Sequence, residues 1–177
     1  MEDYQLVDKA RKGDRQAFSR LYHQYIDSIY RFVLLKIGNK QLAEDITSQV
    51  FLQAWKHIRR YRITRVPFSG WLYRIARNQI IDFYRSYRPR LSLDETKLDI
   101  WINNPVTEFD EKAELKQIYV ALKKLSEIQQ SVVIMKFIEG LSNKEIAQAL
   151  RKSEGAVKLI QHRAIKKLKE ELYEHRK

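Results

Sequence analysis

Apolar residues recur along this chain at the spacings of three, four and five that place them on one face of an α-helix. After Asp14, which is expected to cap a helix, these positions are Ala17, Leu21, Tyr25, Ile29, Phe32 and Ile37. Gly38 is expected to end that helix and Asn39 to cap the next one. Because the sequence has no alternating apolar and polar run long enough for a β-strand, the pattern predicts an all-α fold.

Further helices are predicted from start signals and apolar spacing. The helix after Asn39 carries Leu42, Ile46, Val50 and Ala54, with Phe51, Trp55 and Ile58 widening its apolar face. Ser69 is expected to cap an element from Gly70 to about Tyr87, and a second group of helices is expected to begin near Phe109. Ser126 and Ser142 each precede a Gln or Glu by three residues, which is the pattern of a capping box.

Composition narrows the class of protein. The chain has 177 residues, of which 44% are hydrophobic, so it can bury a core. Its 34 basic and 22 acidic residues give a net charge of +12, which favours a polyanionic partner such as nucleic acid. It has no cysteine, which excludes disulfides, cysteine-ligated metals and cysteine nucleophiles. The first 14 residues do not resemble a signal peptide, and no apolar run approaches the roughly 18 residues of a membrane span, so a soluble, cytoplasmic protein is expected.

Charge divides the chain into parts. Residues 56–90 contain ten basic residues and one acidic residue, and residues 151–177 contain nine basic and four acidic ones. Between them, residues 91–115 hold seven acidic and two basic residues. We therefore expect two small helical domains, at 1–89 and 112–177, joined by an acidic linker at 90–111.

The first basic segment is typical of a nucleic-acid surface. Its loop, residues 61–68, mixes cations with aromatic residues, and arginines would neutralise phosphates while aromatic rings stack on unpaired bases. In the helix that follows, Leu72, Ile75, Ala76, Gln79 and Phe83 are predicted to face a core, and Arg74, Arg77, Ile81, Arg85 and Arg88 to face away. The candidate binding residues are Tyr61, Arg62, Arg65, Phe68, Trp71, Arg74, Arg77 and Arg85, with Tyr84 as a further aromatic. Some of these aromatic residues must belong to the core, and the sequence does not separate them.

The second basic segment has the pattern of a helix-turn-helix. A short helix over 140–150 is followed by a turn at Arg151-Lys152, and Ser153 is expected to cap a helix from Glu154 to about Leu168. Ile146, Ala147 and Leu150 are predicted to face Val157, Ile160, Ala164 and Leu168. Ser153, Glu154, Gly155, Lys158, Leu159 and His162 would then reach base edges in the major groove, and Arg163, Lys166, Lys167 and Lys169 would contact phosphates. A plain antiparallel helix pair is the alternative.

No enzyme chemistry is predicted. The four histidines, His23, His57, His162 and His175, share no metal-ligand spacing, and the sequence has no glycine-rich phosphate loop. We therefore expect no catalytic residue, no metal and no cofactor.

Two stretches resemble a known family. LAEDITSQVFLQAW, residues 42–55, and FSGWLYRIARN, residues 68–78, with Asp82 and Arg85, look like region two of bacterial sigma factors. Residues 141–168 look like sigma region four. With both regions joined directly by a short linker, the chain resembles the extracytoplasmic-function (ECF) group. Three departures are Ser126 where proline is common, Arg151 where glycine is usual, and the sequence of residues 158–163.

The resemblance implies a function and partners. The face of the helix 42–55 that carries Asp45, Gln49, Leu52 and Gln53 would dock on the β′ clamp helices of core RNA polymerase, and region four would meet the β flap. The loop 61–68 with Arg74, Arg77 and Asn78 would open and recognise the minus-ten promoter element. The helix from Ser153 would recognise the minus-thirty-five element, and an anti-sigma factor could cover the same surfaces. The main alternative is a helix-turn-helix regulator that binds DNA without polymerase; an RNA-binding or structural helical protein is a more distant one.

Overall fold

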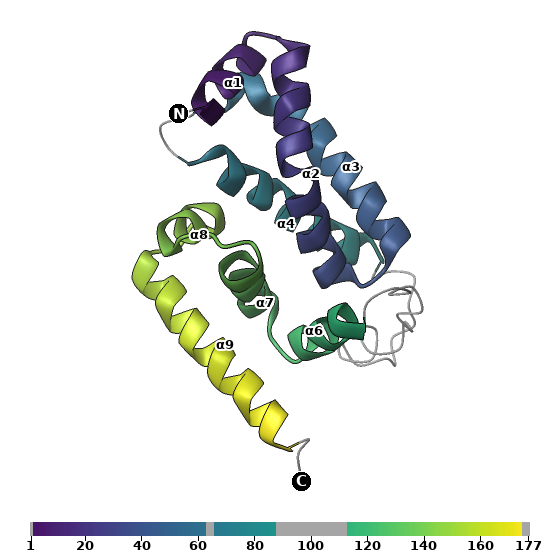
Figure 1. Ribbon diagram of the computed structural model, residues 1–177, viewed down its shortest axis with the longest axis vertical. Helices are drawn as coiled ribbons and strands as arrows, with labels where there is room; N and C mark the ends of the chain where they lie inside the picture. Colours follow the sequence, from purple (N-terminus) through teal and green to yellow (C-terminus); the bar gives the residue numbers. More distant parts are fainter. Residues whose placement is uncertain (1, 63–65, 88–112, 175–177) are drawn as a thin grey trace.

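The computed structural model describes residues 2–62, 66–87 and 113–174, and within these ranges it contains helices and no strand, which confirms the all-α prediction. The helices are α1 (Glu2–Arg11), α2 (Arg15–Ile37), α3 (Lys40–His57), the 3₁₀ turn η1 (Ile58–Arg60), α4 (Phe68–Tyr87), α6 (Ala113–Lys123), α7 (Glu127–Val133), the π-helix η3 (Ile134–Ile138), α8 (Asn143–Leu150) and α9 (Glu154–Glu174). None of these helices is long and apolar enough to cross a membrane. Figure 1 shows α1–α4 as an N-terminal bundle and α6–α9 as a C-terminal group beside it.

The predicted caps of the N-terminal bundle are present. The Asp14 carboxylate accepts hydrogen bonds from the backbone N–H groups of Gln16 and Ala17 at 2.9 and 3.0 Å. Gly38 ends α2 with a φ of 77°, and Asn39 Oδ1 accepts from the Leu42 N–H at 2.9 Å. These side-chain contacts satisfy backbone groups that a helix end leaves unpaired, so local sequence determines where α2 and α3 begin and end. The helix α1 was not predicted.

The start of α4 corrects one prediction. Ser69 does not cap this helix, because α4 begins at Phe68 and the Pro67 carbonyl accepts the first helical hydrogen bond, from the Trp71 N–H at 3.0 Å. The buried face of α4 also differs from the predicted one. Between Trp71 and Ser86 its buried residues are Leu72, Tyr73, Ala76 and Ile80, whereas Ile75, Gln79 and Phe83 are half-buried. The stripe shifts because α4 packs against α2 and α3 on one side and against α8 on another.

The C-terminal group contains the predicted helix-turn-helix. Ser126 and Ser142 both form capping boxes, with Gln129 and Glu145 as the returning side chains. Arg151 makes the turn after α8 in the left-handed conformation, at a φ of 54°, and Ser153 Oγ accepts from the Ala156 N–H at 3.1 Å. Ile146, Ala147 and Leu150 of α8 and Val157 and Ala164 of α9 are buried, as the spacing predicts. The helix α9 continues to Glu174, past the predicted end.

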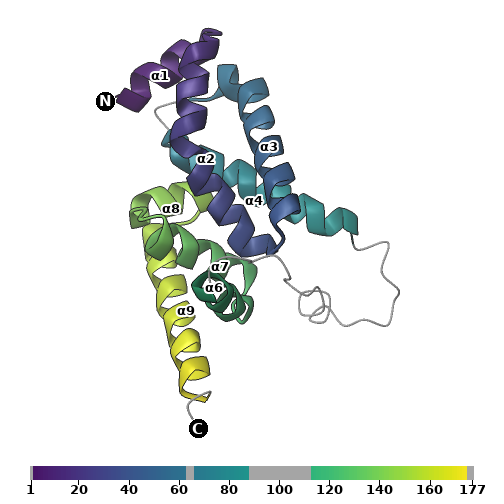
Figure 2. The ribbon, with the colours of Figure 1, turned by 45° about the vertical axis from the view of Figure 1, so that its right-hand side comes forward.

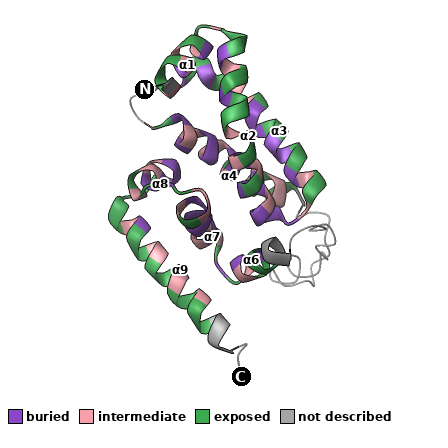
Figure 3. Ribbon diagram, viewed as in Figure 1, coloured by how far each residue is buried: buried purple, intermediate pink, exposed green. Residues whose placement is uncertain are grey.

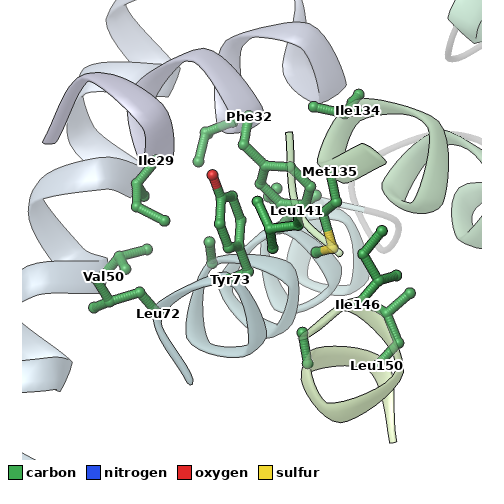
Figure 4. Packing of buried hydrophobic residues seen from close by; sticks show 14 of the residues in the cluster. Ile29, Phe32, Val50, Leu72, Tyr73, Ile134, Met135, Leu141, Ile146 and Leu150 are labelled. Carbon is green, nitrogen blue, oxygen red and sulfur yellow. The ribbon is translucent and has the colours of Figure 1, made fainter. Parts of the chain in front are cut away.

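The two halves share one hydrophobic core. Phe32 of α2 and Tyr73 of α4 meet edge to face with ring centroids 5.2 Å apart. Met135 and Leu141 of the C-terminal group belong to the same cluster of buried residues and lie beside these rings (Figure 4). Figure 2, turned by 45°, shows the same close approach of the two halves, in which α8 contacts α4 and α6 contacts α2. The described helices therefore pack as one closed unit.

Candidate nucleic-acid interface

The helix-turn-helix presents an open face along α9. Val157 and Ala164 have no exposed surface, which fixes the rotation of the helix against α7 and α8. Gln161 Nε2 also donates to Asn143 Oδ1 at 2.8 Å, which ties α9 to the start of α8. The predicted base-contacting residues are all exposed: Ser153, Glu154, Gly155, Lys158, Leu159 and His162; so is Arg163, which is predicted to contact phosphate. Figure 3 shows this face of α9 as largely exposed, so the structure places the predicted residues together on one accessible side of the helix.

The aromatic residues of the first basic segment lie mostly inside the protein. Tyr61 and Phe68 retain only 6% and 4% of their surface, and their rings meet at 5.8 Å. Trp71 is half-buried, and its ring centroid lies 4.8 Å from that of Tyr61 and 5.7 Å from that of Phe68. Burial raises the pKa of Tyr61 to about 12, and its hydroxyl donates to the Val66 carbonyl. In this structure Tyr61 and Phe68 therefore hold the two ends of the loop and are not exposed for base stacking. Tyr84 is half-buried and its hydroxyl donates to the Lys36 carbonyl at 3.3 Å.

The arginines and polar residues of this segment fall into two groups. Arg62, Asn78 and Arg85 are exposed. The Nη1 atom of Arg85 lies 3.8 Å from Oδ1 of Asp82 on the same helix. Arg65 and Arg88 lie outside the described residues. Arg74 and Arg77, in contrast, are half-buried and contact the C-terminal group.

Arg74 contacts the C-terminal end of α8. Its Nε donates to the Ala149 carbonyl at 3.2 Å, and its Nη2 donates to the Gln148 carbonyl. Carbonyls in the last turn of a helix lack intrahelical partners and carry the negative end of the helix dipole. The Arg74 guanidinium thus occupies an electrostatically favourable position against the first helix of the helix-turn-helix.

Arg77 shares a carboxylate with a buried lysine. Arg77 Nη2 donates to Glu127 Oε2 at 2.7 Å and Nε donates to Oε1 at 3.0 Å. Lys36, whose side chain has no exposed surface, donates from Nζ to Glu127 Oε1 at 2.6 Å and to Ser131 Oγ at 2.7 Å. Burial alone would raise the pKa of Glu127, but the charges of Lys36 and Arg77 and their hydrogen bonds hold it at about 2. Burial lowers the pKa of Lys36, and Glu127 opposes that shift.

A different surface lies on the outer side of α2 and α3. Asp45, Gln49 and Leu52 of α3 are exposed, Leu52 by 49%, and Gln53 is half-buried. Tyr22 of α2 is partly exposed and packs edge to face on Phe51, with ring centroids 4.8 Å apart. This face has an exposed apolar centre with polar side chains around it, an arrangement found at protein–protein interfaces.

Comparison with known proteins identifies the family. The model of sigma-70 region 2 matches residues 21–90, and the model of sigma-70 region 4 matches residues 115–168. The ECF RNA polymerase sigma factor SigW of Bacillus subtilis is 32% identical, with 94% of each chain covered. The chain belongs to the ECF family of RNA polymerase sigma factors. The ECF sigma factor BldN of Streptomyces coelicolor is 37% identical over 93% of this chain, which spans 63% of the length of BldN.

Solved structures agree with the fold of this sigma factor. The structure of CnrH in complex with the cytosolic domain of CnrY matches with a TM-score of 0.76 at 24% identity, over 97% of both chains. The sigma factor RpoE of Bartonella quintana, solved in complex with the anti-sigma factor NepR, matches with a TM-score of 0.66 at 21% identity, over 88% of this chain. As an ECF sigma factor, the chain is a promoter-specificity factor of RNA polymerase, and the alternative of a regulator that acts without polymerase is not favoured.

Sequence reasoning missed the charged contacts between regions 2 and 4 of this sigma factor. Lys36 and Glu127 were not singled out, and neither was the pair in which Arg31 Nε donates to Glu139 Oε1 at 2.6 Å. One signal was present, because Lys36 follows Phe32 by four residues and therefore falls on the apolar stripe of α2. Its partner Glu127 lies 91 residues further along the chain, and no local pattern connects the two.

Proposed function

We propose that this ECF sigma factor holds core RNA polymerase with one surface and promoter DNA with two others. The docking surface comprises Asp45, Gln49, Leu52 and Gln53 of α3, which would meet the β′ clamp helices, while region 4 meets the β flap. The observation that carries the proposal is the exposed face of α9 behind a correctly capped helix-turn-helix, in a chain matched by both sigma regions. We also propose a domain at 1–89 and a domain at 112–177, which pack on each other through the shared core; the acidic linker proposed at 90–111 lies outside the described residues.

Region 4 would recognise the minus-thirty-five element through α9. A recognition helix contacts base edges with its N-terminal residues, and side chains at its flanks contact the phosphates. Glu154, Lys158 and His162 lie on the exposed face of the first turns, and Arg163 continues it. Region 2 would recognise and open the minus-ten element with Arg62, Arg65, Arg74, Arg77, Asn78 and Arg85. Trp71 is the half-buried aromatic of this surface, and Tyr61 and Phe68 would contribute stacking only after the loop they hold has rearranged.

Lys158→Ala is expected to weaken recognition of the minus-thirty-five element by about tenfold, since one base contact contributes about 1–3 kcal/mol of discrimination. The measurement is transcription by the holoenzyme from a series of templates that differ only in that element. Lys167→Ala is the matched control, because this exposed lysine is assigned to phosphate and its loss should weaken all templates equally. Wild-type discrimination by the Lys158 variant would show that the outward face is misassigned.

Arg77→Ala combined with Arg85→Ala is expected to slow promoter opening by at least about tenfold, because two cations near the opened strand are lost. Binding to core polymerase should stay near normal. Opening is measured by the fluorescence of 2-aminopurine placed in the minus-ten element, and core binding by a separate titration. Arg15→Ala with Arg20→Ala removes the same charge from exposed positions of α2 and should open promoters normally. A loss of core binding in the Arg77 and Arg85 variant would mean that these side chains support the fold or the docking face.

We propose further that an anti-sigma factor binds this chain, that the chain works in the cytoplasm and that it has no catalytic activity of its own. The support for a partner is the closed arrangement of regions 2 and 4, which matches in fold a CnrH chain solved with the cytosolic domain of CnrY. Support for a purely binding role comes from the family, whose members are transcription initiation factors.

The deciding experiment is transcription from a pool of genomic promoters by core polymerase, with and without this protein, with the RNA ends sequenced. Discrete new start sites that share two upstream elements are expected. Specific binding to duplex DNA by the protein alone, with no start sites that depend on core polymerase, would instead establish the helix-turn-helix regulator.

A further inference from the structure

Three arginines of region 2 each face a negative group of region 4. Arg74 faces the carbonyl end of α8, Arg77 faces the Glu127 carboxylate, and Arg31 forms a two-bond contact with the Glu139 carboxylate at 2.6 and 3.0 Å. Two of these, Arg74 and Arg77, are residues to which the proposed function gives promoter DNA as the partner. In the closed chain they are already engaged by protein.

The Glu127 contact has the chemistry of a phosphate site. A planar guanidinium from α4, a lysine ammonium from α2 and the Ser131 hydroxyl converge on the same carboxylate. Guanidinium groups bind carboxylate and phosphate with the same paired geometry, and lysine adds a point charge to either anion. Both cations belong to region 2, and the anion belongs to region 4, so separation of the regions would leave the cations facing solvent as a pair.

Lys36 has no exposed surface, and a lysine is rarely buried to this extent unless an opposite charge accompanies it, as Glu127 does here. A buried charge that loses its partner is strongly destabilising, whereas the same charge in water or beside a phosphate is not. The Lys36 ammonium therefore needs contact with an anion in every state in which it is buried from solvent.

We propose that Glu127 is an internal substitute for a promoter backbone phosphate, which occupies a phosphate-binding pair formed by Lys36 and Arg77 and so holds region 2 closed against DNA. The inference rests on the proposed function of the region 2 surface. It adds Lys36 as a DNA-contacting residue and makes closure and DNA binding mutually exclusive. Promoter DNA or an opened state imposed by polymerase releases Glu127, and the vacated pair then accepts a phosphate.

The test uses the full chain without polymerase and a short fluorescein-labelled single-stranded DNA of mixed sequence, with binding followed by anisotropy at several salt concentrations. Glu127→Gln keeps the size of the side chain and removes its charge. It is expected to raise the affinity by about tenfold, because a larger fraction of the chain is then competent to bind. Glu44→Gln is the matched control: it makes the same charge change at an exposed position of α3, away from the surfaces assigned to DNA. An equal gain in both variants would overturn the proposal.

A second variant tests the lysine. Adding Lys36→Met to Glu127→Gln should remove the gain and reduce the slope of log affinity against log salt by about 0.7, the value for one phosphate contact on a single strand. An unchanged slope would show that Lys36 does not bind phosphate and would overturn that assignment.

Closure itself is measured independently. Since the chain has no cysteine of its own, Arg20→Cys and Lys166→Cys give two exposed labelling positions, one in each region, for energy transfer. Glu127→Gln should lower the transfer without DNA, and the single strand should lower it in the wild-type sequence. Transfer that DNA and Glu127→Gln both leave unchanged would overturn the proposal even if affinities shift.

Transcription of the wild-type chain with core polymerase tests the proposed function separately, since a chain that transcribes normally but shows none of these effects fails only the inference.

Discussion

Leu52→Asp is expected to abolish binding of this sigma factor to core RNA polymerase. Leu52 is 49% exposed at the centre of the α3 face, beside Asp45 and Gln49, so about half of its side chain is left uncovered by the described residues. A central apolar anchor of an interface contributes about 2 kcal/mol or more, and an unpaired carboxylate buried in its place adds a further penalty of several kcal/mol. Together these effects amount to a loss of affinity of more than about a hundredfold. Titration of labelled core polymerase with the variant measures it.

The chain offers a closely matched control. Leu159 is also 49% exposed, but it lies on the α9 face that is assigned to DNA. Leu159→Asp introduces the same group at the same exposure and should leave core binding intact while damaging use of the minus-thirty-five element. If Leu159→Asp lost core binding and Leu52→Asp kept it, the docking surface would be on region 4 and the assignment to α3 would be wrong.

Features that depend on neighbouring residues could be predicted from the sequence. Asp14, Asn39, Ser142 and Ser153 cap helices where expected, because a cap joins a side chain to backbone groups two or three residues away. The helix-turn-helix was predictable for a similar reason, since the apolar spacing of α8 and α9 determines which faces pack. The proposed docking face of α3 follows only from the resemblance to a family, and it remains a prediction.

Features that depend on distant residues could not be predicted. Tyr61 and Phe68 were assigned to stacking on bases, but they pack on each other and on Trp71, and whether an aromatic ring lies inside or outside depends on the whole bundle. The shifted stripe of α4, with Tyr73 buried against Phe32 of α2, reflects packing between helices that are distant from each other in the sequence. Propensity and periodicity contain no information about such contacts.

The two interpretations of Arg74 and Arg77 are compatible. A run of arginines predicts an anionic partner without specifying whether it is a phosphate, a carboxylate or the carbonyl end of a helix. In the closed chain the partners are the α8 carbonyls and Glu127. The sequence therefore indicated the chemistry of the surface, and the structure adds that region 4 satisfies the same chemistry when regions 2 and 4 are packed together.

Gly38→Ala is expected to disrupt the contact between regions 2 and 4. Gly38 ends α2 at a φ of 77°, a conformation that costs an L-residue about 1–2 kcal/mol. A Cβ atom there would also overlap the ring of Tyr119, a buried residue of α6 whose hydroxyl donates to the Ile37 carbonyl at 3.3 Å. The ring must move, so α6 loses its packing contact with α2.

Gly140→Ala separates the two causes of this effect. Gly140 has a φ of 71°, but an added Cβ would meet nothing within 4 Å. This variant should lower the free energy of unfolding by only about 1–2 kcal/mol, whereas Gly38→Ala should lower it by about 3–5 kcal/mol, the cost of displacing a buried aromatic side chain in addition to the backbone strain. Denaturant titration gives both values, and energy transfer between labels at positions 20 and 166 should fall only for Gly38→Ala.

Because the clash requires the ring, Tyr119→Ala should make Gly38→Ala markedly less costly than it is in the wild-type background. Equal losses at Gly38 and Gly140 would show that backbone strain acts alone and that Tyr119 yields without cost to the contact between the regions.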